Sequence, residues 1–371
     1  MSTFDCLVVG AGFSGAVLAE RLAVGLQRTV LVIDRRDHLG GNAYDFFDDA
    51  GILVHKYGPH IFHTNSKKVF DYLSQFTPWR HYEHRVKAWV DGRLVPFPIN
   101  SETIRLLCGV TGTADQIANW LESVAEPGRI INNSEDAIVS KFGRHLFDKL
   151  FRSYTRKQWG LEASQLSPCV TTRVSARHNE DDRYFTDTYQ VMPKDGYNRM
   201  FEKMLNHPNI TVSLNTRYKN VAQIQRTHTF YTGPIDEFFS YCFGRLPYRS
   251  MRFVRSTLDC EQFQPVGVVT YPNDEDYTRI TEFRHITGQA HTKTSIMYEF
   301  PTAEGEPFYP VPTAESASTY KRYSELARKL TNASFSGRLG SYQYLNMDQA
   351  VAQSLALFDS HSKRQPMASL S

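Results

Sequence analysis

The sequence has little of several features that mark large classes of proteins. Its five cysteines are odd in number, widely spaced and without a CxxC pair, which argues against a disulfide framework and a cysteine zinc site. We therefore expect reduced, mostly buried thiols and no bound metal. No apolar run reaches the about 18 residues of a membrane-spanning helix, and the first residues lack the charged segment and cleavage site of a secretion signal. These absences predict a cytoplasmic protein without membrane insertion.

A strong excess of charge of one sign is missing as well. The 371 residues include 42 Lys and Arg against 39 Asp and Glu, a formal net charge of +3. Because a nearly neutral chain does not bind nucleic acid through bulk electrostatics, we expect no nucleic-acid partner. The 41% of hydrophobic and 22% of charged residues are ordinary for a globular protein, and the length suggests two or three domains. The 20 tyrosines are compatible with a polar, ring-shaped ligand.

The N-terminal segment carries the most informative pattern. A short apolar run at 4–9 is followed by Gly10, Gly12 and Gly15 in the order GxGxxG, and then by helical periodicity. A second apolar run at 29–33 ends in Asp34, 19 residues after Gly15. Glycines between a strand and a helix allow a backbone to approach a pyrophosphate, and an acid at this spacing can accept hydrogen bonds from a ribose. A glycine-rich turn with a surface Asp is the alternative, but this context favours a dinucleotide site.

A second glycine pair follows Asp34 at Gly40 and Gly41, before Asn42. An acid followed six residues later by Gly-Gly resembles the FAD version of this fold more than the NAD version. The alternative interpretation of the pair is a plain turn.

The remaining pattern predicts helices and further strands. Residues 84–100 indicate a hairpin that turns at Asp91-Gly92, and 100–160 indicate helices, the last at about 144–159. The polar segment 173–189 predicts a long exposed loop, in which we expect Arg177 and Arg183 to be solvated surface charges. Runs near 251–258, 266–271, 277–283 and 294–300, with the hairpin, predict a mostly antiparallel sheet of about six strands. The fold class is α/β.

Several motifs, in order along nearly the whole chain, resemble the UDP-galactopyranose mutase family. They are GGNAY at 40–44, HKYGPHIFHT at 55–64, YTRKQWG at 154–160, YTGPID at 231–236, YTR at 277–279, EPFYP at 306–310 and GRL at 337–339. The resemblance implies a discontinuous FAD-binding Rossmann-like domain (1–83, 190–236 and 315–371) and an inserted helical domain (100–165). It also implies an antiparallel sheet domain (84–99, 166–189 and 237–314) with a mobile loop at 173–189.

The resemblance also implies a reaction. Family members interconvert UDP-galactopyranose and UDP-galactofuranose without net redox change, through a covalent iminium between flavin N5 and the sugar, and they require reduced FAD. A nucleophile supplied by the cofactor would agree with the lack of a GxSxG motif or a metal-ligand cluster in this sequence. Partners implied are UDP-galactose or a related nucleotide sugar, an external electron donor such as NAD(P)H, and a second copy in a homodimer.

Site residues follow by matching motif positions. Arg173 and Arg279 match arginines that hold the diphosphate, and His60 matches a histidine beside the flavin ring. Substrate-binding matches are Leu150, Tyr154, Thr155, Trp159, Tyr184, Thr270, Tyr309, Tyr344 and His84; Phe151 is interpreted as a core residue. Cofactor-binding matches are Gly10, Gly12, Ser14, Gly15, Asp34, Gly41, Asn42, His60, Ile61, Arg338, Met347, Asp348 and Gln349.

The sequence departs from the family pattern at a few of these positions. Asn346 stands where an Asp usually precedes Met347, and Pro312 replaces an Asn. Thr270 or Val269 stands where an Asn usually meets the sugar side, and His84 stands at another Asn position. These changes leave an N-acetylated or deoxy hexose open as the substrate. A redox flavoprotein of the amine oxidase or desaturase type and a non-catalytic binder of Rab-escort type share the fold and are the alternative functions. A redox flavoprotein of this type would need an apolar substrate tunnel. The intact glycines and Asp34 argue against a non-catalytic binder.

Overall fold

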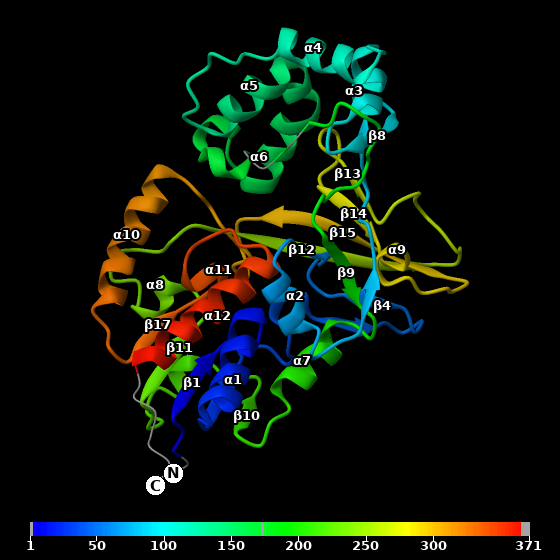
Figure 1. The fold of residues 1–371 in the computed structure, drawn as a ribbon. Coiled ribbons are helices and arrows are strands. Elements are labelled where there is room, and N and C mark those ends of the chain that lie inside the picture. Colours follow the sequence, from blue (N-terminus) through cyan, green and yellow to red (C-terminus); the bar gives the residue numbers. More distant parts are fainter. Residues whose placement is uncertain (1–2, 172–173, 175, 365–371) are drawn as a thin grey trace.

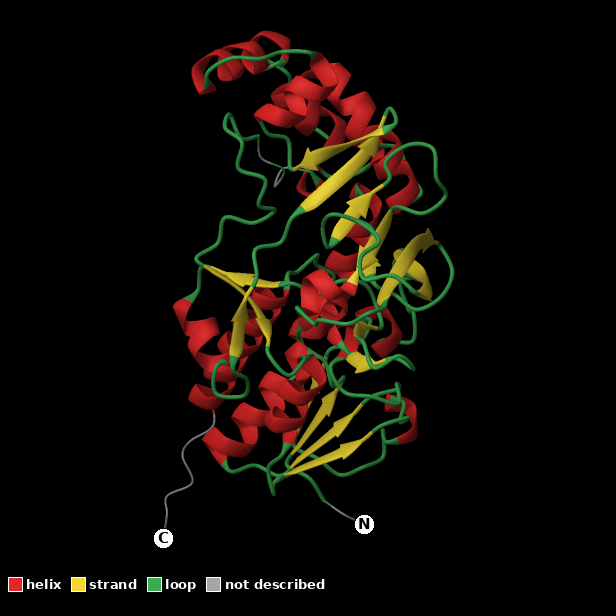
Figure 2. Ribbon diagram, turned by 90° about the vertical axis from the view of Figure 1, so that its right-hand side faces the viewer, coloured by secondary structure: helices red, strands yellow, loops and turns green. Residues whose placement is uncertain are grey.

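The computed structural model describes residues 3–171, 174 and 176–364. Figure 1 shows three layers: a parallel sheet with its helices at one end, a long mixed sheet in the middle, and a group of helices at the other end. Figure 2, turned by 90°, shows the same succession. The candidate site lies where these layers meet.

The parallel sheet has the order β10-β2-β1-β11-β17. Its strands are β1 (Cys6–Val9), β2 (Val30–Ile33), β10 (Ile210–Ser213), β11 (His228–Tyr231) and β17 (Ala333–Phe335). Helices α1 (Phe13–Leu26), α7 (Tyr197–Leu205) and α12 (Met347–Arg364) share one core cluster with β1 and β2, while Leu7, Leu31 and Ile33 pack into a second cluster. Burial on both faces explains why β1 and β2 are continuous apolar runs. The strand–turn–helix–strand unit predicted at the N-terminus is confirmed.

The glycines of the first turn are required by close backbone approaches. Gly10 has φ +105°, which a side chain disfavours. A Cβ on Gly15 would lie 1.8 Å from the carbonyl oxygen of Gly10, and a Cβ on Gly41 would lie 3.0 Å from the Cα of Gly12. The turn after β1 therefore packs against both α1 and the second glycine pair.

The mixed sheet has the order β16-β12-β15-β14-β13-β7-β8. Its strands are β7 (Val86–Val90), β8 (Arg93–Phe97), β12 (Tyr248–Leu258), β13 (Val268–Thr270), β14 (Arg279–Glu282), β15 (Thr294–Thr302) and β16 (Tyr309–Pro310). The hairpin turns at Asp91 (φ 50°) and Gly92 (φ 74°), as its sequence predicts. The mostly antiparallel sheet is confirmed, with two differences: β13 pairs with β7 in parallel, and β16 is an additional short strand.

The helical layer contains α3 (Ser101–Cys108), α4 (Ala114–Val124), α5 (Ser134–Phe147), a π-helical segment at Asp148–Arg152 and α6 (Ser153–Trp159). Asn100 and Thr113 accept main-chain N–H groups and cap α3 and α4. Gly143, at φ 75°, breaks the helical geometry within α5, so that the segment after it corresponds to the predicted helix at 144–159. Leu146, Phe147, Leu150 and Phe151 face the interior of this layer.

Smaller elements connect the layers. Strands β3 (Asp45–Phe47) and β4 (Leu53–His55) pair with each other, and β5 (Phe62–Thr64) and β6 (Trp79–His81) flank β9 (Tyr189–Pro193). The remaining helices are α2 (Lys67–Leu73), α8 (Ile235–Phe238), α9 (Phe283–Thr287), α10 (Ala314–Arg328) and α11 (Gly337–Gly340). In the described part of the chain, no helix combines the length and apolar character needed to cross a bilayer.

The cysteines differ in part from expectation. Their thiols are free, as expected, but Cys169, Cys242 and Cys260 are exposed and only Cys6 is fully buried. The expectation of mostly buried thiols is therefore wrong. Cys242 and Cys260 lie in surface connections between elements, and Cys169 lies in a short 3-10 helix at Pro168–Val170.

We expect Gly15→Ala to destabilise the protein strongly. The added methyl group cannot fit 1.8 Å from the Gly10 oxygen, so α1 must move away from β1. Overpacking of this kind should lower the free energy of unfolding by about 3 kcal/mol, measured by urea denaturation. Gly128→Ala is the matched control, because a Cβ there meets no atom within 4 Å. Equal stability of the two variants would contradict the packing argument.

Candidate functional site

A cavity lies at the carboxyl ends of the parallel strands. Segments that follow β1, β2 and β11 line it together with the starts of α1 and α11. This edge of a parallel α/β sheet is where such folds bind ligands. Predicted cofactor residues that line the cavity are Gly10, Gly12, Ser14, Asp34, Gly41, Asn42, His60, Arg338 and Met347.

Asp34 is held in place by main-chain donors. One carboxylate oxygen accepts the N–H of Ala11 at 2.8 Å and the other accepts the N–H of Arg36 at 2.9 Å. The side chain is 8% exposed. Its oxygens thus tie the end of β2 to the glycine turn, at the position where a ribose would bind in a dinucleotide site.

Four predicted cofactor residues, all within the described chain, stand outside the cavity lining. Gly15 is packed against the Gly10 carbonyl, and Ile61 belongs to the core of the parallel layer. The carboxylate of Asp348 accepts the hydroxyl of Thr64 at 2.9 Å, and Gln349 Oε1 accepts the N–H of Asn346 at 2.9 Å. These side chains support the turn and the start of α12.

Arg36 lies at the junction of two layers and was not selected from the sequence. Its guanidinium pairs with Glu306 at 2.6 Å, donates to Asn42 Oδ1 at 3.0 Å and lies 4.1 Å from the centre of the Tyr57 ring. The side chain is 10% exposed and lines the cavity. Its position two residues after Asp34, within the dinucleotide-binding motif, is the sequence feature that could have indicated a role at the cavity.

His60 is a neutral imidazole at the cavity wall. Burial and, to a smaller extent, the nearby cations of Arg338 and Arg279 lower its pKa to about 4. Its Nδ1 lies 2.9 Å from the carbonyl oxygen of Gly58. Since a carbonyl only accepts, Nδ1 carries the proton and Nε2 keeps a free lone pair. His60 can therefore accept a hydrogen bond without adding charge to the cavity.

A cluster of rings adjoins the cavity at Arg338. Tyr309 and Tyr344 stack with centres 5.5 Å apart, and the ring of Trp159 lies 6.3 Å from each. The guanidinium carbon of Arg338 lies 5.2 Å from the Tyr309 ring and 5.1 Å from the Tyr344 ring. The fold thus brings together predicted substrate residues from α6, β16 and the segment before α12.

A row of polar residues crosses the mixed sheet beside this cluster. Arg279 on β14 pairs in register with Thr270 on β13 and with Glu299 on β15. Paired residues on adjacent strands lie on the same face of a sheet. Arg279 Nε lies 2.8 Å from a carboxylate oxygen of Glu299, whose side chain is 1% exposed.

Burial acts on both partners of the pair: it raises the pKa of Glu299 above its ordinary value, although Arg279 acts in the opposite direction. Burial would lower the pKa of Arg279, but Glu299 raises it well above its ordinary value. The phenols of Tyr154 and Tyr309 act in the same direction. Glu299 was not selected from the sequence; the signal was a single acid within the otherwise uncharged strand at 294–302.

The other predicted substrate residues are more scattered. Leu150 is 4% exposed and belongs to the core of the helical layer, and Thr155 is buried on α6. His84 Nδ1 lies 3.1 Å from the Tyr82 hydroxyl, and the His84 ring lies 5.7 Å from that of Tyr184. Among the described residues, no group of three or more His, Cys, Asp or Glu side chains gathers as metal ligands would.

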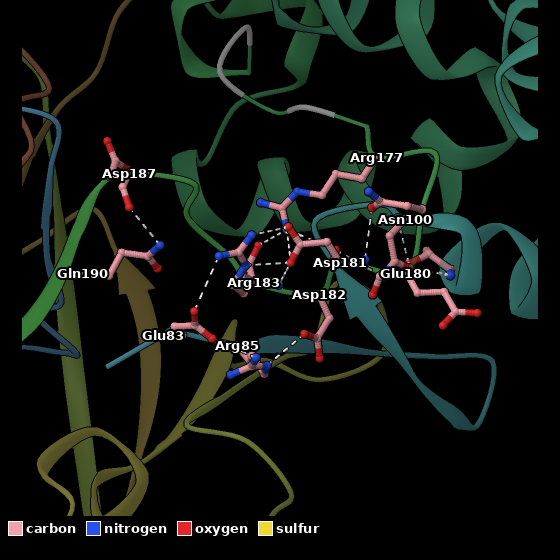
Figure 3. Close-up of polar contacts among 12 residues, drawn as sticks. Glu83, Arg85, Asn100, Arg177, Glu180, Asp181, Asp182, Arg183, Asp187 and Gln190 are labelled. Atoms are coloured by element: carbon pink, nitrogen blue, oxygen red, sulfur yellow. Dashed lines mark hydrogen bonds and ion pairs between the residues drawn. The ribbon is translucent and has the colours of Figure 1, made fainter. Parts of the chain in front are cut away.

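The segment 174–188 connects the helical layer to β9. Arg173 lies outside the described residues. Figure 3 shows how the described part is attached: Arg85 pairs with Asp182 at 2.8 Å, and Asn100 donates to the carbonyl of Glu180 at 3.4 Å. Beyond an isolated bridge between Arg85 and Arg183, its described residues form neither helix nor strand, as a loop requires.

One expectation for this segment is wrong. Arg177 is not a solvated surface charge: its side chain is 10% exposed and donates to the carbonyl oxygens of Asp181 and Arg183. Arg183 is more exposed and pairs with Asp181 at 2.9 Å (Figure 3). A guanidinium can satisfy several carbonyls of a folded-back loop, which a lone position in the sequence does not reveal.

The parallel sheet, its glycine turn and the cavity above it define a dinucleotide-binding protein of Rossmann-like α/β class. Comparison with family models supports this class: residues 8–76 match an NAD(P)-binding Rossmann-like domain, and residues 149–344 match UDP-galactopyranose mutase. The chain belongs to the UDP-galactopyranose mutase family, and the resemblance drawn from its motifs is confirmed.

Known relatives span almost the whole chain. A Klebsiella pneumoniae protein named "Probable UDP-galactopyranose mutase" is 38% identical, covering 97% of this chain and 95% of the relative. An Escherichia coli dTDP-fucopyranose mutase is 34% identical, covering 94% and 96%. A crystal structure of reduced UDP-galactopyranose mutase superposes with a TM-score of 0.79 at 17% identity, over 98% of this chain and 95% of the other, which supports the fold.

We expect acid to destabilise the protein through three histidines whose pKa values are lowered in the folded state. Burial lowers the pKa of His55 to about 3, of His60 to about 4 and of His84 to about 3, whereas an unfolded His titrates near 6.5. The unfolded chain therefore binds more protons between about pH 6.5 and 4, and stability falls as the pH is lowered through this window. Each histidine contributes a slope of about 1.4 kcal/mol per pH unit.

The matched variants are His84→Asn and His81→Asn, because His81 is exposed. Urea denaturation at several pH values should give a slope smaller by about 1.4 kcal/mol per unit for His84→Asn alone. An unchanged slope would mean that His84 is protonated in the folded protein.

Proposed function

We propose that this chain is an FAD-dependent isomerase that interconverts the pyranose and furanose forms of a nucleotide-linked galactose, UDP-galactopyranose and UDP-galactofuranose, without net redox change. The observation that supports the proposal most strongly is that the dinucleotide cavity is continuous with the cluster of aromatic rings beside it. Arg338 lines the dinucleotide cavity and also lies over the rings of Tyr309 and Tyr344, beside Trp159. A cofactor and a uridine diphosphate sugar would meet at this arginine.

The cavity residues fit a flavin dinucleotide. Gly10, Gly12 and Gly15 keep the first turn free of side chains, and the N-terminus of α1 offers N–H groups to a pyrophosphate. Asp34 can accept ribose hydroxyls with the lone pairs that its main-chain bonds leave. The second glycine pair, Gly40-Gly41, extends the cavity beyond a single turn, as a long dinucleotide requires.

Reduced FAD, when bound, would supply N5 as the nucleophile that holds the sugar while its ring opens and recloses. The protein would control charge. Arg279 is fixed by Glu299, so its remaining N–H donors can hold the diphosphate that departs. Neutral His60 would offer Nε2 as an acceptor near the flavin without competing positive charge.

The match of Arg173 to a second diphosphate arginine stays a prediction, as do the domain boundaries, the closing of 173–189, the NAD(P)H donor, the homodimer and the cytoplasmic location. The predicted roles of Leu150, Tyr154, Thr155, Tyr184 and Trp159 in holding the uridine diphosphate also stay proposals.

A second candidate substrate is a deoxyhexose nucleotide. One relative is named dTDP-fucopyranose mutase, at an identity close to that of the relative named for UDP-galactopyranose. In this chain the hydroxyl of Thr270 donates to the Lys87 carbonyl at 3.3 Å, and His84 Nδ1 meets Tyr82. Neither residue supplies the free amide that an asparagine would offer to a sugar hydroxyl.

The test is to isolate the protein with its flavin spectrum, reduce it with dithionite, add UDP-galactofuranose and separate the products by chromatography. UDP-galactopyranose formed only under reduction supports the proposal. Conversion of dTDP-fucofuranose in preference would select the second candidate. Absence of a flavin, or consumption of reductant with every turnover, would overturn the proposal that the protein is an isomerase.

We expect Arg279→Lys to weaken both UDP binding and turnover by about tenfold or more, because lysine keeps the charge but loses the planar fork that binds phosphate oxygens. Arg252→Lys is the matched control: Arg252 lies on β12 with its guanidinium 3.9 Å from the Phe300 ring. Calorimetric titration with UDP and steady-state rates measure the two effects. Equal loss in both variants would argue against a direct role of Arg279.

A further inference from the structure

The ammonium group of Lys157 has an unusual set of partners. Nζ donates to the main-chain carbonyl oxygens of Tyr271 at 2.5 Å, Glu275 at 2.7 Å and Tyr277 at 3.3 Å. Three acceptors match the three donors of an ammonium group. All of them belong to the connection between β13 and β14, although Lys157 itself lies on α6.

These carbonyls lie in the turn that leads directly into Arg279. The N–H of Tyr271 donates to the Thr278 carbonyl at 2.8 Å, which closes the turn, and the N–H of Thr278 donates to the Glu299 carbonyl at 2.9 Å. Tyr277 is two residues before Arg279, so the turn ends where β14 begins. A change in the turn would therefore be transmitted to the first residue of β14.

The helix that carries Lys157 also carries the ring wall of the candidate site. Tyr154 and Lys157 are three residues apart on α6 and lie on one face of it. The Tyr154 phenol is among the groups that raise the pKa of Arg279. Lys157 thus connects the element that presents Tyr154 and Trp159 to the strand that presents Arg279.

We propose that Lys157 is a positioning residue, which holds the turn at 271–278 and through it sets Arg279 at the correct distance from α6 for a nucleotide diphosphate. This inference rests on the function proposed above. Lys157 acts through main-chain carbonyls and need not touch the substrate.

The surroundings of Lys157 argue against an ordinary surface lysine. Its hydrogen bonds go to carbonyls, although the turn also carries the carboxylates of Asp274, Glu275 and Asp276. Burial lowers the pKa of Lys157 to about 8, and these acids act in the opposite direction. Removing an ammonium group from water costs free energy, which its three hydrogen bonds to main-chain carbonyls must offset. These bonds hold the carbonyls of the turn in place.

A second contact attaches the same turn to the helical layer and provides the control. Asn273 Nδ2 donates to the main-chain carbonyl of Lys149 at 3.1 Å, while the Lys149 ammonium pairs with Asp91 at 2.7 Å on the surface. Lys149→Met removes the cation of a residue that contacts the turn only through its carbonyl, and it leaves that contact in place.

The experiment compares the flavin-loaded wild type, Lys157→Met and Lys149→Met. Calorimetric titration with UDP should show affinity about tenfold weaker for Lys157→Met and within twofold of the wild type for Lys149→Met. Hydrogen exchange of the amides in 271–278 should be at least tenfold faster in Lys157→Met alone. Thermal melting reports whether the fold itself is lost.

The outcomes separate the inference from the proposed function. If Lys157→Met melts earlier but binds UDP as the wild type does, Lys157 is merely structural and the inference is overturned. If the wild type does not bind UDP, the proposed substrate is wrong, and the exchange rates of 271–278 then decide whether Lys157 holds the turn. Equal exchange in all three proteins would overturn the inference whatever the ligand.

Discussion

The ion pair between Arg279 and Glu299 is the constraint on which the candidate site depends. An isolated carboxylate that is 1% exposed would be costly to bury, so Glu299 requires a cation beside it. The hydrogen-bonded register of β14 and β15 supplies that cation at 2.8 Å without relying on flexible loops. Because Glu299 lies against Nε, the terminal nitrogens of Arg279 are left for other acceptors.

A second ion pair, of a largely buried cation, connects two of the layers. Arg36 belongs to the fingerprint of the parallel sheet, yet its partner Glu306 comes from the segment between β15 and β16. The Tyr57 ring lies against the guanidinium, with 4.1 Å between the ring centre and the guanidinium carbon. The cavity is therefore lined both by the fingerprint of the parallel sheet and by Pro307 and Phe308 before β16, and its shape depends on contacts between residues 270 positions apart.

Local patterns allowed much of the fold to be predicted. The glycines at 10, 12 and 15, the apolar runs around them and the Asp91-Gly92 turn act over a few residues, where steric rules are strong. Predictions failed where a side chain's surroundings come from distant segments. Arg177 was expected to be solvated because its neighbours in the sequence are polar, whereas the folded loop buries it against its own carbonyls. The prediction for the cysteines failed for the converse reason, since free thiols are usually covered in a folded protein and three of these five are exposed.

The candidate site divides in the same way. The sequence by itself determined the dinucleotide turn, Asp34 and the family motifs, because each depends on short spacing along one segment. Only the tertiary structure decided that Glu299 faces Arg279 and that Arg338 joins the cavity to the ring cluster. It also decided that Lys157 on α6 donates to the turn between β13 and β14. These contacts depend on strand register and on the packing of layers. Both result from many weak interactions over the whole chain, so no single sequence position predicts them.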